Sequence, residues 1–180
     1  KPSAEAAQIS SIIQKYILGR PDISFRFISG GKDVYFSSGD GSLKNAIHSV
    51  YGKDIYLKLI PVSFADGSIK IEGYIGEPET ARATKTMQNL FVNSRYIRSD
   101  IISNSVKQGY LNRIMPAKHP VYALNLLMPY DEIDVNVHPN KLEVRFKEEG
   151  FIQECFFKAV KQAFDNFEKL STSNYTLNSQ

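Results

Sequence analysis

The residues best suited to chemistry lie between Asp134 and Phe146, where apolar and polar side chains alternate on both sides of Pro139. This alternation predicts two short strands, because successive side chains of a strand point to opposite faces. Proline cannot donate to a strand ladder, so Pro139 marks a bend between them. Lys141 therefore lies on a bend at the edge of a rigid scaffold, where a lysine is a mobile point charge suited to a phosphate group.

A second feature is the clustering of positive charge between residues 82 and 118. This segment holds seven basic residues and one acid, Asp100, so it carries +6 while the rest of the chain carries −3. Such a cluster is a candidate electrostatic footprint for a polyanion, although a basic solvated surface has the same pattern. The basic residues are Arg82, Lys85, Arg95, Arg98, Lys107, Arg113 and Lys118.

Other chemistry finds little support in the sequence. Asp134, Asn136 and His138 share a strand face, but one histidine and one aspartate are too few for a metal site. Cys155 lies beside two phenylalanines in a helical pattern and is expected to be a buried, inert thiol. The chain has no glycine-rich phosphate loop and no pair of closely spaced cysteines. It contains no complete enzyme, so we expect no cofactor in this fragment alone.

Length and composition indicate one domain of ordinary globular type. The chain has 180 residues, of which 42% are hydrophobic. No apolar run approaches the roughly 18 residues of a membrane span. The sequence begins with a lysine just before a helix signal, and we interpret it as a fragment of a longer protein.

The periodicities predict an α+β fold in which helices lie mainly on one face of a mixed sheet. Strands are expected at 23–27, 32–37, 55–64, 69–76, 88–93 and 121–128, with a hairpin turn at Asp66-Gly67. Helices are expected near the N-terminus, after Ser42, from Ser99 or Asp100, and over 151–170. One domain would span residues 1–170, and the polar stretch 171–180 would be a disordered tail or linker.

Three blocks of the sequence resemble the MutL family of DNA mismatch repair proteins. They are Leu90–Arg95 (LFVNSR), His119–Tyr122 (HPVY) and Asp134–Phe146 (DVNVHPNKLEVRF), in the family's order and spacing. The third block follows the family pattern without a gap, whereas Ser94 replaces a usual glycine in the first. The resemblance covers residues 2–170, and residues 1–5 look like the junction after an ATPase domain.

The resemblance implies the transducer domain of a GHKL-type ATPase, with a ribosomal-protein-like fold and a left-handed βαβ crossover. It implies that Lys141 reaches the γ-phosphate of ATP in the adjacent N-terminal ATPase domain, which would hold most of the ATP and Mg²⁺. Alone the fragment would be no enzyme; in the full-length protein it would belong to an ATPase. The residues expected to support the lysine loop are Asn136, His138, Pro139 and Asn140.

The resemblance also implies sequence-independent DNA binding, and the candidate residues are Arg95, Arg98, Lys107 and Arg113. Asp100 begins the predicted helix, at a position where some relatives carry a basic residue. As an acid at a helix start, it could simply stabilise the helix. The implied partners are the ATPase domain, a MutS-type mismatch sensor, a downstream nuclease or helicase, and a second copy of the full-length protein. No membrane is implied, and the expected location is the cytoplasm or nucleoid of a bacterium, or the nucleus of a eukaryote.

Two alternatives remain open at this point. One is a transducer domain from another GHKL machine, such as a type II topoisomerase. The other is a free-standing nucleic-acid-binding domain of ribosomal type. The block from Asp134 to Phe146 favours the mismatch repair family, because topoisomerases use a different lysine motif.

Overall fold

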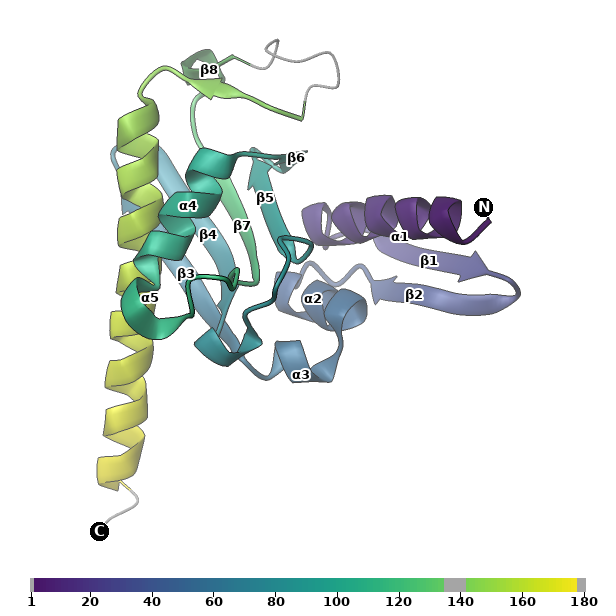
Figure 1. Cartoon of the computed structure of the whole chain (residues 1–180), viewed down its shortest axis with the longest axis horizontal. Coiled ribbons are helices and arrows are strands. Elements are labelled where there is room, and N and C mark those ends of the chain that lie inside the picture. Colours follow the sequence, from purple (N-terminus) through teal and green to yellow (C-terminus); the bar gives the residue numbers. More distant parts are fainter. Residues whose placement is uncertain (1, 135–141, 178–180) are drawn as a thin grey trace.

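A five-stranded mixed sheet organises the chain (Figure 1). The computed structural model describes residues 2–134 and 142–177. The strand order is β3-β4-β7-β5-β6, and only the neighbours β5 and β7 are parallel. The strands are β3 (Leu59–Asp66), β4 (Ile69–Gly76), β5 (Gln88–Val92), β6 (Arg95–Ile97) and β7 (Tyr122–Leu127).

The larger core fills one face of this sheet, beneath α4 (Asp100–Gly109) and α5 (Glu149–Leu177) (Figure 1). Ser99 caps α4 by accepting a hydrogen bond from the backbone N–H of Ile102. The helix predicted over residues 151–170 is confirmed as part of α5, in which Phe156 and Val160 are fully buried. Cys155 is buried in the same core, and this burial raises the pKa of its thiol.

A smaller core lies on the opposite face, where α1 (Pro2–Gly19), α2 (Leu43–Tyr51) and α3 (Lys53–Tyr56) pack. Ile17, Ile47 and Phe91 belong to it. The expectation that helices cover mainly one face is therefore met by α4 and α5, while three shorter or peripheral helices use part of the other face. Two strands, β1 (Ser24–Ser29) and β2 (Lys32–Ser38), form a separate antiparallel sheet beside α1.

The connection from β5 to β7 has the unusual hand implied by the family resemblance. In Figure 1, α4 lies in front of the sheet and β7 lies to the left of the upward-running β5. Since β5 and β7 are parallel, the path from β5 through α4 to β7 is left-handed.

Close approach of β4 and β7 requires Gly73, because a Cβ atom there would lie 2.1 Å from the carbonyl oxygen of Ala123.

Most predicted elements are confirmed, but two have other bounds and one strand was not predicted. Residues 55–58 were predicted as strand, but Ile55 is buried in α3 and β3 begins at Leu59. The strand β6 was missed because it is only three residues long. The helix predicted to end at Leu170 continues through Leu177, so the expected tail is helical over that stretch. The proposed single domain over residues 1–170 stays a prediction.

The remaining described elements are short. The strands β8 (Ile133–Asp134) and β9 (Arg145–Phe146) pair with each other, and three 3-10 helices lie at Pro78–Thr80, Leu111–Arg113 and Tyr130–Glu132. Within the described ranges, no helix is long and apolar enough to cross a membrane.

Candidate functional site

The segment from Asp134 to Phe146, which contains Lys141 and is called the lysine segment below, has two described ends that are held together. Strands β8 and β9 pair so that Asp134 lies opposite Arg145 and Ile133 lies opposite Phe146. Phe146 is buried in the larger core, which fixes this short ladder to the body of the protein. The alternation predicted two strands here, and the structure confirms a two-stranded pairing at the segment's ends. The predicted site residues Lys141, Asn136, His138, Pro139 and Asn140 lie outside the described residues.

A second attachment lies next to the lysine position. The backbone N–H of Arg98 donates to the carbonyl oxygen of Leu142 over 2.7 Å. Arg98 directly follows β6 and precedes the cap of α4. The segment is thus joined to the sheet edge and to the start of a helix, both of which are regular and well packed.

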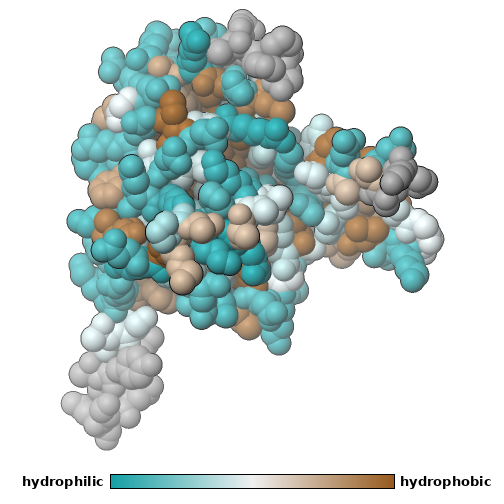
Figure 2. Space-filling model, viewed as in Figure 1, coloured by the Kyte–Doolittle hydropathy of each residue, from teal (hydrophilic) through white to brown (hydrophobic). Residues whose placement is uncertain are grey.

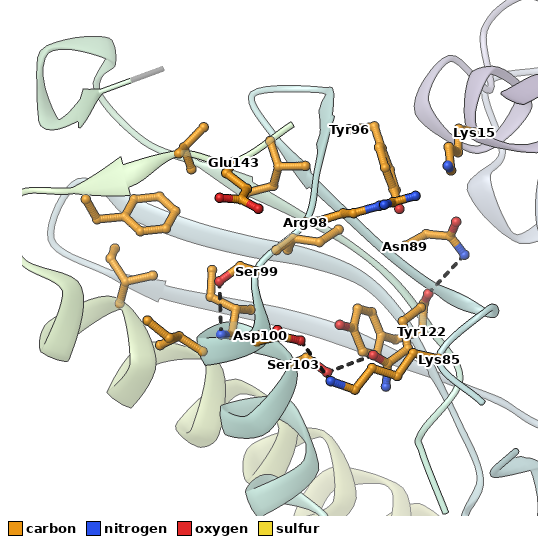
Figure 3. A pocket seen from close by; sticks show the side chains of 18 of the residues that line it. Lys15, Lys85, Asn89, Tyr96, Arg98, Ser99, Asp100, Ser103, Tyr122 and Glu143 are labelled. Carbon is orange, nitrogen blue, oxygen red and sulfur yellow. Dashed lines mark hydrogen bonds and ion pairs between the residues drawn. The ribbon is translucent and has the colours of Figure 1, made fainter. Parts of the chain in front are cut away.

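These attachments border a groove of about 740 Å³ between α1, β6, the start of α4 and the segment 143–146 (Figure 3). Lys15 from α1 enters it from one side, and its ammonium lies 4.4 Å from the centre of the Tyr96 ring. Figure 3 shows Arg98 extending toward Tyr96 and Lys15. The groove is therefore lined by the cationic side chains Lys15 and Arg98, which are far apart in the sequence.

The charges in the groove are partly compensated. Lys85 donates to the carboxylate of Asp100 over 2.8 Å, and this hydrogen bond, with the attraction between the charges, lowers the pKa of Asp100. Asp100 is the first residue of α4, where an acid also complements the helix dipole. Its expected role at the helix start is supported, and it additionally neutralises one groove lysine.

The floor of the groove is polar and fully hydrogen-bonded. Ser103 donates its hydroxyl proton to the side-chain oxygen of Gln88 over 2.7 Å. The amide of Asn89 donates to the hydroxyl oxygen of Tyr51 over 2.8 Å. No buried side-chain nitrogen or oxygen among the described residues lacks a partner, so this network needs no ligand to complete it.

The four predicted DNA-binding residues fall into two groups. Arg95 is exposed at the start of β6, and Arg98 is exposed just after β6, where it lines the groove. Lys107 and Arg113 lie at the other end of α4, where Lys107 donates to the carbonyl oxygen of Pro116. Arg113 pairs with Glu168 at 2.7 Å, and its guanidinium lies 4.6 Å from the centre of the Phe164 ring.

The structure therefore does not bring the four cations into one patch. The pair at the far end of α4 is engaged in contacts with α5 and with the loop after α4, which are structural roles. Arg98, just after β6, instead lines the groove together with Lys15 and Lys85. Sequence reasoning missed Lys15, because only the packing of α1 beside β6 brings it to the groove.

Asn93 has a structural role in the site. It forms the turn between β5 and β6 with φ of 47°, and Ser94 follows with φ of 68°. The Asn93 amide donates to the carbonyl oxygen of Met128 over 2.9 Å, and its side-chain oxygen accepts from the Met128 N–H. Ser94 thus occupies a left-handed conformation that favours glycine, in agreement with the glycine expected there from the family pattern.

Metal binding finds no support in the part of the chain that the structure describes. There, no three His, Cys, Asp or Glu side chains are close enough to hold an ion.

The fold and the sequence both have close counterparts among known proteins. The MutL proteins of Clostridium botulinum and Dictyoglomus turgidum are 37% and 34% identical to this chain, over 96% and 93% of its length. The chain spans only 26% and 29% of those two relatives.

Two solved structures share the fold. One is the N-terminal domain of a DNA repair protein, with a TM-score of 0.72 and 23% identity, and the match covers 88% of this chain and 53% of that one. The other is the ATPase domain of Aquifex aeolicus MutL, with a TM-score of 0.58, 17% identity and coverage of 89% and 53%. A profile of the family "DNA mismatch repair protein, C-terminal domain" matches residues 47–165. The chain therefore belongs to the MutL family of DNA mismatch repair proteins.

Proposed function

We propose that this chain acts in DNA mismatch repair as the transducer part of a longer ATPase, and that Lys141 contacts the γ-phosphate of ATP. The observation that carries the proposal is the double attachment of the lysine segment. The ends of the segment are paired through β8 and β9. Leu142, which directly follows Lys141, accepts a hydrogen bond from the backbone N–H of Arg98. A cation attached in this way can complete a phosphate site owned by another domain.

The nucleotide and its Mg²⁺ would be held mainly by an ATPase domain outside this chain. The described residues around the segment fit such a division, because they supply cations and a rigid backbone and no cluster of metal ligands. The lysine segment would contribute one charge. Asn136, His138, Pro139 and Asn140 would shape the bend that carries it.

Hydrolysis removes the phosphate that this charge would recognise. Loss of one charge-assisted contact can bias a two-state arrangement of domains. We therefore infer that the chain couples hydrolysis of ATP to a change in the relative position of the domains. The partners that would respond to this change are a MutS-type sensor, a downstream nuclease or helicase, and a second copy of the protein.

Contact with DNA backbone is the second part of the proposal, and the groove beside β6 favours it. Lys15 of α1, Lys85 and Arg98 line this groove, and Arg95 lies nearby at the start of β6. Phosphate contacts of this kind give sequence-independent affinity that weakens with salt. Lys107 and Arg113 would contribute less, because neither lines the groove and both are engaged in contacts within the protein. Lys85 is partly neutralised by Asp100.

The decisive experiment replaces Lys141 by alanine in the longer polypeptide. ATP hydrolysis is expected to fall severalfold or more, while the circular dichroism spectrum is unchanged. Lys147→Ala is the matched control, because Lys147 is an exposed lysine just after β9. Normal turnover in the Lys141 variant, or an equal loss in the control, would refute the phosphate role.

A further inference from the structure

The turn between β5 and β6 is a tight hairpin turn that is hydrogen-bonded to the end of β7. Asn93 and Ser94 both have positive φ, 47° and 68°, as a type I′ turn requires. The backbone N–H of Asn93 donates to the carbonyl oxygen of Leu126 over 2.8 Å. The N–H of Ser94 donates to the side-chain oxygen of Asn125 over 3.0 Å. The turn is therefore fixed to a central strand of the sheet.

The side chain of Asn93 extends this contact beyond the end of β7. Its amide nitrogen donates to the carbonyl oxygen of Met128 over 2.9 Å, and its side-chain oxygen accepts from the Met128 N–H over 3.1 Å. An amide that bonds both backbone groups of one residue reproduces one rung of an antiparallel ladder. Met128 is buried, so water competes little for these two bonds. Asn93 thus fixes the chain at the point where it leaves the sheet.

The stretch that follows Met128 leads directly into the lysine segment. Pro129 has φ of −57° and is followed by the 3-10 helix Tyr130–Glu132 and then by β8. The backbone N–H of Lys147 donates to the carbonyl oxygen of Glu132 over 3.1 Å. A proline and a 3-10 turn leave this connector few free dihedral angles. The position of Met128 therefore determines where the lysine segment begins.

Packing contributes little to the position of this connector. None of residues 129–134, all of which the structure describes, is buried, and Tyr130 is 79% exposed. Ile133 packs partly against the larger core. Hydrophilic side chains cover most of the body on the face shown in Figure 2. The hydrogen bonds at Met128 are accordingly a main constraint on the connector.

The same hairpin also holds the other side of the lysine position. Arg98 directly follows β6, and its backbone N–H donates to the carbonyl oxygen of Leu142, the residue after Lys141. In Figure 1, the β5–β6 turn and β8 lie at the same end of the sheet. One hairpin thus bonds to the chain before the lysine segment through Asn93 and after Lys141 through Arg98.

We propose that Asn93 is a positioning residue for ATP hydrolysis, which acts on the lysine segment through Met128. The inference rests on the proposed contact of Lys141 with the γ-phosphate. A cation stabilises a transition state only if it is held in place before the reaction, so a connector that can shift makes Lys141 less effective. Asn93 itself touches no nucleotide in this proposal.

The substitution Asn93→Gly in the longer polypeptide tests the proposal. It removes both side-chain bonds to Met128, while glycine adopts the positive φ of the turn without strain. We expect kcat for ATP hydrolysis to fall about threefold or more, because the lysine is less well positioned. The KM for ATP should change by less than about twofold, since the nucleotide would be held mainly by another domain. An unchanged kcat would overturn the proposal.

A double-mutant cycle with Lys141→Ala shows whether Asn93 acts through the lysine. Adding Asn93→Gly to the Lys141→Ala variant should lower kcat by less than about 1.5-fold further, because the group that Asn93 positions is already absent. An equal fall in both backgrounds would show a general effect on the fold and would overturn the inference. Normal turnover of Lys141→Ala alone would instead refute the phosphate role of Lys141, so the two failures are distinguishable.

Thr80→Ala is the matched control for lost stability. Thr80 is buried and donates its hydroxyl proton to the carbonyl oxygen of Glu77 over 2.6 Å. It lies beside the end of β4 that pairs with the start of β7, whereas Met128 follows the end of β7. The kcat of Thr80→Ala should equal that of the native protein. A fall as large as that of Asn93→Gly would mean that lost stability slows the reaction, and the positioning role would be wrong.

Discussion

The backbone N–H of Arg98 donates to the carbonyl oxygen of Leu142 at 2.7 Å, directly beside the position of Lys141. Arg98 is also one of the cations proposed to bind DNA, and it immediately precedes the Ser99 cap of α4. One residue thus contacts the proposed nucleotide segment through its backbone and faces the basic groove through its side chain. A movement of the lysine segment is therefore expected to shift Arg98 and, with it, the side chain that Arg98 contributes to the groove.

The backbone link can be removed by Arg98→Pro, because proline has no N–H to donate. We expect ATP hydrolysis by the longer polypeptide to decrease, since the lysine segment loses one of its attachments. The matched control is Arg98→Ala, which removes the same side chain and keeps the N–H. Steady-state hydrolysis of the two variants is compared after circular dichroism shows that both are folded. Equal rates would mean that the hydrogen bond to Leu142 does not position the segment.

Charge reversal tests the DNA contact. The double variant Arg95→Glu, Arg98→Glu should bind DNA more weakly, and the slope of log affinity against log salt should decrease by about 2 if two phosphate contacts are lost. Binding is measured by fluorescence anisotropy over a salt series. Lys70→Glu, Lys158→Glu changes the net charge equally at exposed positions on β4 and α5 and serves as control. If both double variants behave alike, net charge rather than this groove governs binding.

The turn between β5 and β6 should respond in opposite directions to two substitutions. Asn93→Ala removes both side-chain hydrogen bonds with Met128 and is expected to lower the free energy of unfolding by about 2 kcal/mol. Ser94→Gly relieves a left-handed residue with φ of 68° and should raise it by about 0.5–1 kcal/mol. Urea denaturation measures both. A destabilising Ser94→Gly would show that the serine is not strained.

Alkaline pH should destabilise the fold through its buried tyrosines. Burial raises the pKa of Tyr51 to about 12, from 10 for an exposed tyrosine. The folded state therefore holds the proton more tightly than the unfolded state. The stabilisation is complete below pH 10 and is lost between pH 10 and about 12.

Tyr51→Phe should reduce the pH dependence in that window by up to about 1.4 kcal/mol per pH unit. The free energy of unfolding is measured by urea denaturation at several pH values. Tyr130→Phe is the control, because Tyr130 is highly exposed. A pH dependence of the Tyr51 variant equal to that of the native protein would exclude this residue as the cause.

Local patterns were sufficient where one periodicity dominated. The helix α5, the start of α4 near Ser99 and the strand β7 were all predicted, because each depends on local patterns along the chain alone. Local patterns failed where short elements compete. Ile55 is apolar enough for a strand, but it is buried within a single helical turn of α3.

The candidate site divides in the same way. The sequence by itself identified the family and the segment from Asp134 to Phe146, because motifs are local properties of a chain. Tertiary structure alone decided which charges meet: it brought Lys15 from α1 beside Tyr96, paired Lys85 with Asp100, and committed Arg113 to Glu168 on α5. Charge pairing depends on distances of a few ångströms between distant segments, and those distances exist only once the helices have packed on the sheet.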